Sequence, residues 1–258
     1  MSEYRKLANQ PLVFALAEFR FSPVLQIDQF IPQFQEAIRK TYPLPEPLQE
    51  HAIQVKGSAV DVSSRMKWAF VESSRQSAVS LDQERLIFIT TEYPRFNGFA
   101  KSCMEALQPL NDIVDPDLLL RIGLRYGDLI EIKDGEKLED YVDPYFGYPK
   151  LAETLGTPEH QRDEVAIRTR VGRLLIRSLY GINPLVCLPD LQGIPALPKP
   201  DAESSQRIIL DFDHIWFGDG SAKFDLSQIE DILGKLHEPA REAFWRITTD
   251  EAKERKWS

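Results

Sequence analysis

The chain has 258 residues, 43% of them hydrophobic and 10% aromatic, which is enough for a sizeable core in one large domain or two closely packed halves. Its formal net charge of −9 argues against general binding to nucleic acids or anionic membranes, because affinity for phosphate groups depends on a surplus of Lys and Arg. The sequence contains no apolar run long enough to span a membrane and no export signal at its start, so we expect a cytoplasmic protein.

Familiar catalytic and redox signatures are missing from the sequence. A nucleophile elbow, a phosphate-binding loop and a dinucleotide-binding fingerprint are all absent, so we expect no cofactor and favour a protein that is not an enzyme. Cys103 and Cys187 form no C-x-x-C pair and cannot build a disulfide framework, which indicates reduced thiols.

The first half of the chain begins with a strand and a helix. Over Pro11–Phe21, one set of alternating residues is wholly apolar and the other ends in Glu18 and Arg20, which is typical of a central strand. Asp28 then predicts the cap of a helix that ends at Tyr42.

A meander and a second helix follow. Residues 43–64 have little pattern and are interpreted as a connection. After them come three strands joined by short turns, and then a helix that Pro109 bends or ends. We expect these strands at Lys67–Glu72, Ser77–Leu81 and Arg85–Tyr93, and the helix from Phe96.

The strongest strand pattern in the chain runs from Leu118 to Ile132. Period-two alternation predicts that its apolar and charged side chains lie on opposite faces. Two glycines, Gly123 and Gly127, are interpreted as marking a β-bulge. The apolar face carries Leu118, Leu120, Ile122, Leu124 and Tyr126, and the other face carries Arg121 and Arg125.

The second half repeats the arginine pattern in a hairpin around Gly172, with strands at Glu164–Val171 and Arg173–Tyr180. The proline-rich stretch 183–205 is interpreted as a mobile connector, with a functional loop as the alternative. A strand, a long helix and a short terminal helix complete the chain. We expect the strand at Arg207–Phe217, the long helix after a cap at Asp225, and the terminal helix after a cap at Thr248.

Strands outnumber helices and hairpins outnumber crossovers, so the sequence predicts an α+β fold with a mainly antiparallel sheet and helices packed on one face. The sheet is expected to come from two related halves, β-α-β-β-β-α-β and then β-β-β-α-α. We place these halves at residues 1–135 and 164–258, packed as one compact unit, with a connector at residues 136–163.

If these strands share one sheet, their polar residues gather on the face away from the helices. Planar guanidinium groups bind a carboxylate or a phosphate at two points, so this face predicts a site for an acidic segment of a protein partner or a small anionic ligand. The alternative is a solvated exterior of cross-strand ion pairs that also include Arg177, Asp211 and Asp213. The predicted ligand-binding residues are Glu18, Arg20, Arg121, Arg125, Arg168 and Arg170.

Asp211, Asp213 and His214 offer an alternative site, because carboxylates and imidazole are common metal ligands and proton carriers. The four histidines of the chain show no zinc-binding spacing, so our main expectation is that no metal is bound and no catalytic residue is assigned. His237, beside the apolar stripe of the long helix, is interpreted as a histidine at the edge of the core that forms a hydrogen bond with the backbone rather than as a catalyst. Aromatic residues on the terminal helix predict a surface for a homodimer.

Three stretches of the chain carry a resemblance to known proteins. Together they resemble an uncharacterised, sporadically distributed family of bacterial proteins of similar length, and the R-I-G-L-R-Y strand motif is the most specific of the three. The resemblance implies a bacterial origin, and no catalytic residues are established for the family that could be carried over to this chain. The patchy distribution suggests defence or toxin–antitoxin gene neighbourhoods. The stretches are Pro11-Leu12 with Glu18-x-Arg20-Phe21, Arg121-Ile122-Gly123-Leu124-Arg125-Tyr126, and Leu236-His237 with Phe244 and Ile247-Thr248.

We therefore expect a non-enzymatic cytosolic binding protein that holds an acidic protein segment or a small anionic ligand on an arginine-lined sheet face, in a bacterial defence or toxin–antitoxin setting. The alternative is a metal-dependent hydrolase or nucleotide-processing enzyme that uses Asp211, Asp213 and His214.

Overall fold

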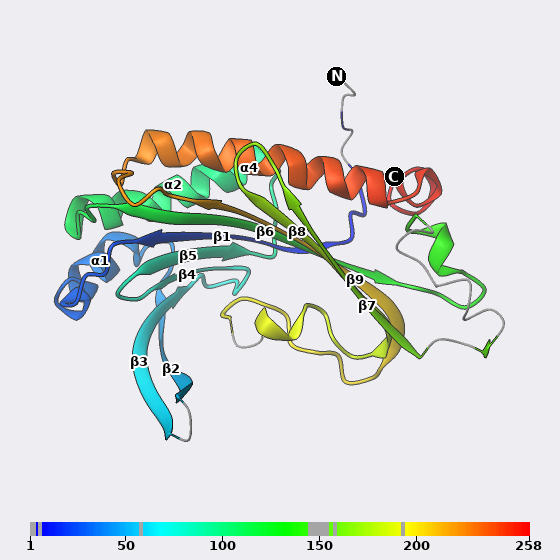
Figure 1. Ribbon diagram of the computed structural model, residues 1–258, viewed down its shortest axis with the longest axis horizontal. Coiled ribbons are helices and arrows are strands. Elements are labelled where there is room, and N and C mark those ends of the chain that lie inside the picture. Colours follow the sequence, from blue (N-terminus) through cyan, green and yellow to red (C-terminus); the bar gives the residue numbers. More distant parts are fainter. Residues whose placement is uncertain (1–3, 5–6, 57–58, 144–154, 157–158, 192–193) are drawn as a thin grey trace.

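The computed structural model describes residues 4, 7–56, 59–143, 155–156, 159–191 and 194–258. The described strands form one antiparallel sheet in the order β2-β3-β4-β5-β1-β6-β9-β8-β7, and helices lie along one side of it (Figure 1). The predicted α+β class with a mainly antiparallel sheet is confirmed. The strands are β1 (Leu12–Phe21), β2 (Leu44–Lys56), β3 (Ala59–Val71), β4 (Ser77–Leu81), β5 (Arg85–Thr90), β6 (Leu119–Glu131), β7 (His160–Arg168), β8 (Arg173–Asn183) and β9 (Ser205–Phe217).

The main core lies between the sheet and three helices, each of which contributes buried residues to it. Apolar residues recur every three or four positions along these helices, as at Ile229, Leu233 and Leu236, and they pack on Ile122 and Leu124 of β6. Within the described residues, every helix is too short or too polar to cross a lipid bilayer. The helices are α1 (Ile31–Ile38), α2 (Phe96–Ile113) and α4 (Leu226–Ile247), and short helical turns lie at Ile27–Gln29, Leu138–Asp140, Pro189–Leu191 and Ala252–Lys256.

β6 lies near the middle of the sheet and joins the two predicted halves. It pairs with β1 of the first half on one side and with β9 of the second half on the other. The sheet therefore continues across both halves. Much of the predicted connector between them, at residues 144–154 and 157–158, lies outside the described residues.

The proline-rich stretch between β8 and β9 packs on the sheet face away from the helices (Figure 1, yellow). Its residues Val186, Cys187 and Leu191 are buried in a second apolar cluster with Phe14 and Leu16 of β1. The interpretation of this stretch as a mobile connector is therefore wrong for its described part, because burial of these apolar side chains stabilises it against the sheet. We call residues 184–191 and 194–204 the covering segment.

The expected connection at residues 43–64 is also wrong. β2 and β3 form a long hairpin there, and among the described strands β2 is an edge strand that pairs with β3. Pro45 and Pro47 are tolerated in β2 because every second residue of an edge strand points its backbone N and C=O away from the neighbouring strand. A residue at such a position needs no N–H group for pairing.

The limits of the first two helices differ from the prediction. Asp28 lies in the turn before α1 and makes no cap, and α1 ends at Ile38 rather than at Tyr42. α2 continues through Pro109 to Ile113.

The cap of the last helix is confirmed, because the carboxylate of Asp225 accepts a hydrogen bond from the backbone N of Gln228 at 2.8 Å. The terminal turn is instead capped by Thr249, one residue after the predicted Thr248. The aromatic residue of that turn, Trp257, is buried and stacks on Phe244, so it offers no exposed surface to a second subunit.

The alternation of β6 is confirmed from Ile122 to Tyr126, which face the helices. At the start of the strand, however, Leu119 is buried whereas Leu118 and Leu120 are partly exposed. The register against β1 shifts by one residue there, so a β-bulge reverses the alternation.

Candidate functional site

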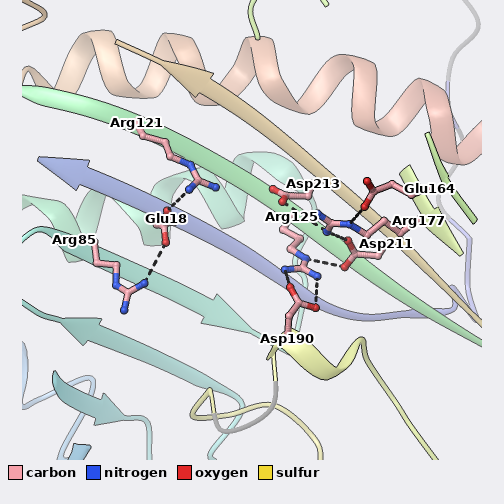
Figure 2. Close-up of polar contacts among 9 residues, drawn as sticks. All are labelled: Glu18, Arg85, Arg121, Arg125, Glu164, Arg177, Asp190, Asp211 and Asp213. Atoms are coloured by element: carbon pink, nitrogen blue, oxygen red, sulfur yellow. Dashed lines mark hydrogen bonds and ion pairs between the residues drawn. The ribbon is translucent and has the colours of Figure 1, made fainter. Parts of the chain in front are cut away.

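The sheet face away from the helices carries arginine and acidic side chains, which we call the polar face. The strand order places β1, β6, β9 and β8 side by side, so residues far apart in the sequence meet here (Figure 2). The polar face consists of Glu18 and Arg20 from β1, Arg85 from β5, Arg121 and Arg125 from β6, Arg177 from β8, and Asp211 and Asp213 from β9.

Arg125 is the centre of the polar face and lies between two carboxylates. Its Nε donates to Asp211 at 2.7 Å, and its Nη1 and Nη2 donate to the two oxygens of Asp190 at 2.7 and 3.1 Å. Burial alone would lower the pKa of Arg125, but the two carboxylates raise it, so the guanidinium keeps its charge. Such two-point, charge-assisted contacts are the strong form of this interaction.

Asp190 is a partner that the sequence prediction missed. It lies in the helical turn of the covering segment, and its side chain is 57% exposed. Partial burial works against its ionisation, but the hydrogen bonds and charge of Arg125 hold the pKa of Asp190 below its ordinary value. An acid between Leu188 and Leu191 in a proline-rich stretch is the available sequence signal, and it does not point to Arg125.

Arg177 continues the network away from Arg125. It donates to Glu164 at 2.9 Å and to Asp211 at 3.1 Å, and it lies 3.8 Å from Asp213. Burial raises the pKa of Asp211 to about 6 against the opposing charges of Arg125 and Arg177, and burial also raises the pKa of Asp213. At this end of the polar face, carboxylates outnumber the guanidinium groups of Arg125 and Arg177.

Glu18 is the centre of the other end, where arginines are in excess. Its oxygens lie 2.9 Å from Nε of Arg20, 3.4 Å from Nη1 of Arg121 and 3.8 Å from Nη1 of Arg85. Arg85 also bonds to Asp82 at 2.6 Å. The Nε of Arg121 is buried and has no hydrogen-bond partner in the described part of the chain.

Arg168 and Arg170 lie apart from the other predicted arginines. Both are exposed at the end of the edge strand β7, and neither forms an ion pair within residues 159–191 or the other described ranges. Arg168 shares a cross-strand row with Glu18, but four strand spacings of roughly 4.8 Å separate them by about 19 Å. The polar face thus includes four of the six predicted residues.

The alternative site does not assemble, because alternate residues of a strand project to opposite faces. Asp211 and Asp213 lie on the polar face, whereas His214 points to the helix side, with Nδ1 2.7 Å from the carbonyl oxygen of Leu236 and Nε2 2.9 Å from the hydroxyl of Thr169. Burial lowers the pKa of His214. Among the described residues, no group of three or more His, Cys, Asp or Glu side chains is arranged to hold a metal ion.

Compared with known proteins, the chain matches no protein-family model and no curated protein. The resemblance to a sporadically distributed bacterial family therefore stays a prediction.

Proposed function

We propose that this chain is a binding protein that holds an acidic protein segment, or a small anionic ligand, on the polar face at Arg125. The ion pair between Arg125 and Asp190 carries the proposal, because a carboxylate from a separate segment already occupies the two-point geometry of the guanidinium. The covering segment acts as an acidic segment bound in cis. A partner segment of the same chemistry would take its place.

Exchange of Asp190 for another carboxylate leaves no buried charge unpaired. Arg125 keeps its contact with Asp211, which is 1% exposed, whereas Asp190 is largely exposed and its ion pair contributes on the order of 1 kcal/mol. An incoming segment would extend towards Glu18, where arginines are in excess and the Nε of Arg121 has no acceptor among the described residues. It would avoid the acid-rich end at Asp213.

The cellular compartment and the biological context are part of the same proposal. Cys103 and Cys187 are free and buried, which supports a reducing compartment such as the bacterial cytoplasm. A defence or toxin–antitoxin context and a homodimer remain predictions. We do not propose an enzyme at Asp211, Asp213 and His214, because these side chains lie on opposite faces of the sheet.

Binding of a fluorescently labelled oligo-aspartate peptide, followed by fluorescence anisotropy, tests the proposal. D190N removes the competing charge and leaves Arg125 paired with Asp211, so we expect it to bind the peptide about five-fold more tightly than the wild type, and more weakly at high salt.

E203Q is the matched control, because Glu203 is an exposed acid of the same covering segment that has no ion pair in the described part of the chain. We expect its affinity to equal that of the wild type. Equal affinities of D190N and E203Q, or no saturable binding of the peptide by D190N, would contradict the proposal.

A further inference from the structure

A cavity of about 430 Å³ lies on the helix side of the sheet, opposite the polar face. β6 and β9 form its floor, and α4, the start of α2 and the residues Tyr4, Leu7 and Gln10 form its walls. Its volume lies within the range of small-molecule sites. Aromatic rings make up much of its surface, among them those of Tyr126, Phe212, Phe244 and Trp245.

Asp128 is the unusual residue in this cavity. It lies two residues after Tyr126 on the helix-facing side of β6, and it is only 3% exposed. Within the described part of the chain, no group forms a hydrogen bond or an ion pair with its carboxyl group. A buried carboxyl without a partner is costly, so such a group in a cavity indicates a ligand that supplies the missing donor.

Two other polar side chains of the cavity, those of Tyr126 and His237, interact with each other. The hydroxyl of Tyr126 lies 2.9 Å from Nδ1 of His237, whose ring stacks on Phe96 with 4.2 Å between centroids. Burial lowers the pKa of His237 to about 3, so this ring stays neutral. The interpretation of His237 as a histidine at the edge of the core is confirmed by its position, although its partner is Tyr126 rather than the backbone.

The positive groups of the cavity are held away from Asp128. Arg241 forms an ion pair with Glu238 and lies over the ring of Tyr4, and Arg95 is exposed at the rim. The Nε of Arg241 is buried and lacks an acceptor among the described residues. The titratable and charged groups that face Asp128 across the cavity or the sheet are Tyr4, Tyr93, Arg95, Tyr126, Asp211, His237, Arg241 and Glu242.

We propose that this cavity binds a small organic amine, with the protonated nitrogen at Asp128 and an apolar or aromatic body against the rings of Phe212, Phe244 and Trp245. An acceptor atom at the far end of the ligand would pair with the Nε of Arg241. This proposal does not rest on the polar face, because the two sites lie on opposite sides of the sheet.

Binding of the amine has a proton balance that calorimetry can detect. Burial, helped by the charge of Asp211, raises the pKa of Asp128 to about 8, so in the empty cavity the carboxyl is mostly protonated near neutral pH. The incoming ammonium group stabilises the carboxylate. The proton of Asp128 then leaves for the solvent, and the affinity rises with pH up to about 8.

Titration calorimetry with phenethylamine near neutral pH, in two buffers of different ionisation enthalpy, tests the proposal. We expect saturable binding and release of close to one proton per amine. D128N should bind the amine about ten-fold more weakly or worse, and without proton release. D112N, which removes an exposed acid at the far end of α2, should behave like the wild type.

Two comparison compounds make the test specific. Phenylpropionate and phenylethanol carry the same ring with a carboxylate or a hydroxyl in place of the amine, and we expect both to bind more weakly than phenethylamine. The proposal is overturned if either binds as tightly as the amine, if D128N keeps the affinity of the wild type, or if phenethylamine does not bind. Because D128N replaces an unpaired buried carboxyl group with an amide of similar size that cannot ionise, it is expected to fold.

Discussion

Asp128 links the stability of this protein to pH. The folded state raises the pKa of its carboxyl group to about 8, whereas the unfolded chain exposes the group to water and lets it ionise near its ordinary pKa. Between these two values the folded state holds a proton that the unfolded state has released. Unfolding therefore becomes more favourable as the pH rises through this range.

We predict that D128N is more stable than the wild type, and that the difference in the free energy of unfolding grows by about 1.4 kcal/mol per pH unit between about pH 4 and pH 8. Below this range the wild-type carboxyl is protonated in both states, and above it the carboxyl is ionised in both, so the difference stays constant at either end. Urea unfolding at a series of pH values measures it. D112N should show no such trend, and a difference independent of pH would argue that Asp128 is not buried as an acid.

At the scale of single elements, β6 contains two glycines that have different roles. An ideal Cβ on Gly127 would lie 2.0 Å from Cε1 of Phe14, whose ring covers this position next to a register shift in β1. A Cβ on Gly123 would meet its nearest neighbour, the Cβ of Glu18, at an ordinary 3.8 Å. Gly127 is therefore required by the approach of a ring, whereas the neighbouring register shift lies in β1, between Leu12 and Phe14.

We predict that G127A lowers the free energy of unfolding by about 1–3 kcal/mol, because the ring of Phe14 must move within a packed cluster. G123A, on the same face of the same strand, should change it by less than about 0.5 kcal/mol. Thermal or urea unfolding of both variants provides the comparison. Part of the loss should be recovered in the double variant G127A/F14L, and equal stability of G127A and G123A would contradict the packing argument.

The elements that the sequence predicted best are the strands that have one face on the main core. Apolar residues that face the helices at alternate positions leave a period-two pattern in the sequences of β1 and β6, and this pattern located both strands. β2 was missed because Pro45 and Pro47 argue against a strand unless the strand is known to lie at the edge of the sheet. The local sequence pattern does not reveal the order of the strands.

The same limit applies to the candidate sites. Alternation was sufficient to place Arg125 and Asp211 on one face, but Asp190 reaches them from a segment whose path depends on tertiary packing. Asp128 continues the helix-facing alternation of Tyr126, and a charged residue at such a position is the signal that would have found the cavity. That Arg125 pairs with carboxylates could be expected from composition. Which carboxylates pair with it depends on the fold.

On the scale of the whole molecule, the two cysteines lie in different apolar clusters. Cys103 is a residue of α2 that is fully buried in the main core, and Cys187 is a residue of the covering segment that is buried in the second apolar cluster. Burial raises the pKa of both thiols. Release of Cys187 requires only the covering segment to lift, whereas release of Cys103 requires the core to open.

We predict that Cys187 reacts with an aromatic disulfide reagent at least about ten-fold faster than Cys103 under native conditions, because local opening costs less free energy than global unfolding. Variants that keep a single cysteine separate the two rates. D190N should accelerate the reaction of Cys187 and leave that of Cys103 unchanged, and E203Q should affect neither. Equal rates at the two thiols would mean that the covering segment and the core open as one unit.

The position of β6 has a consequence that concerns both faces of the sheet. Asp128 on one side and Asp211 on the other lie close enough that the charge of Asp211 contributes to the raised pKa of Asp128. Coupling of this kind is reciprocal, so ionisation of Asp128 makes Asp211 easier to protonate, and the opposite charge of a bound ammonium group reduces this effect. A change in the titration of Asp211 on addition of phenethylamine, followed by NMR, would report this coupling. The strand would then transmit occupancy from the cavity to the polar face through protons alone, without movement of the backbone.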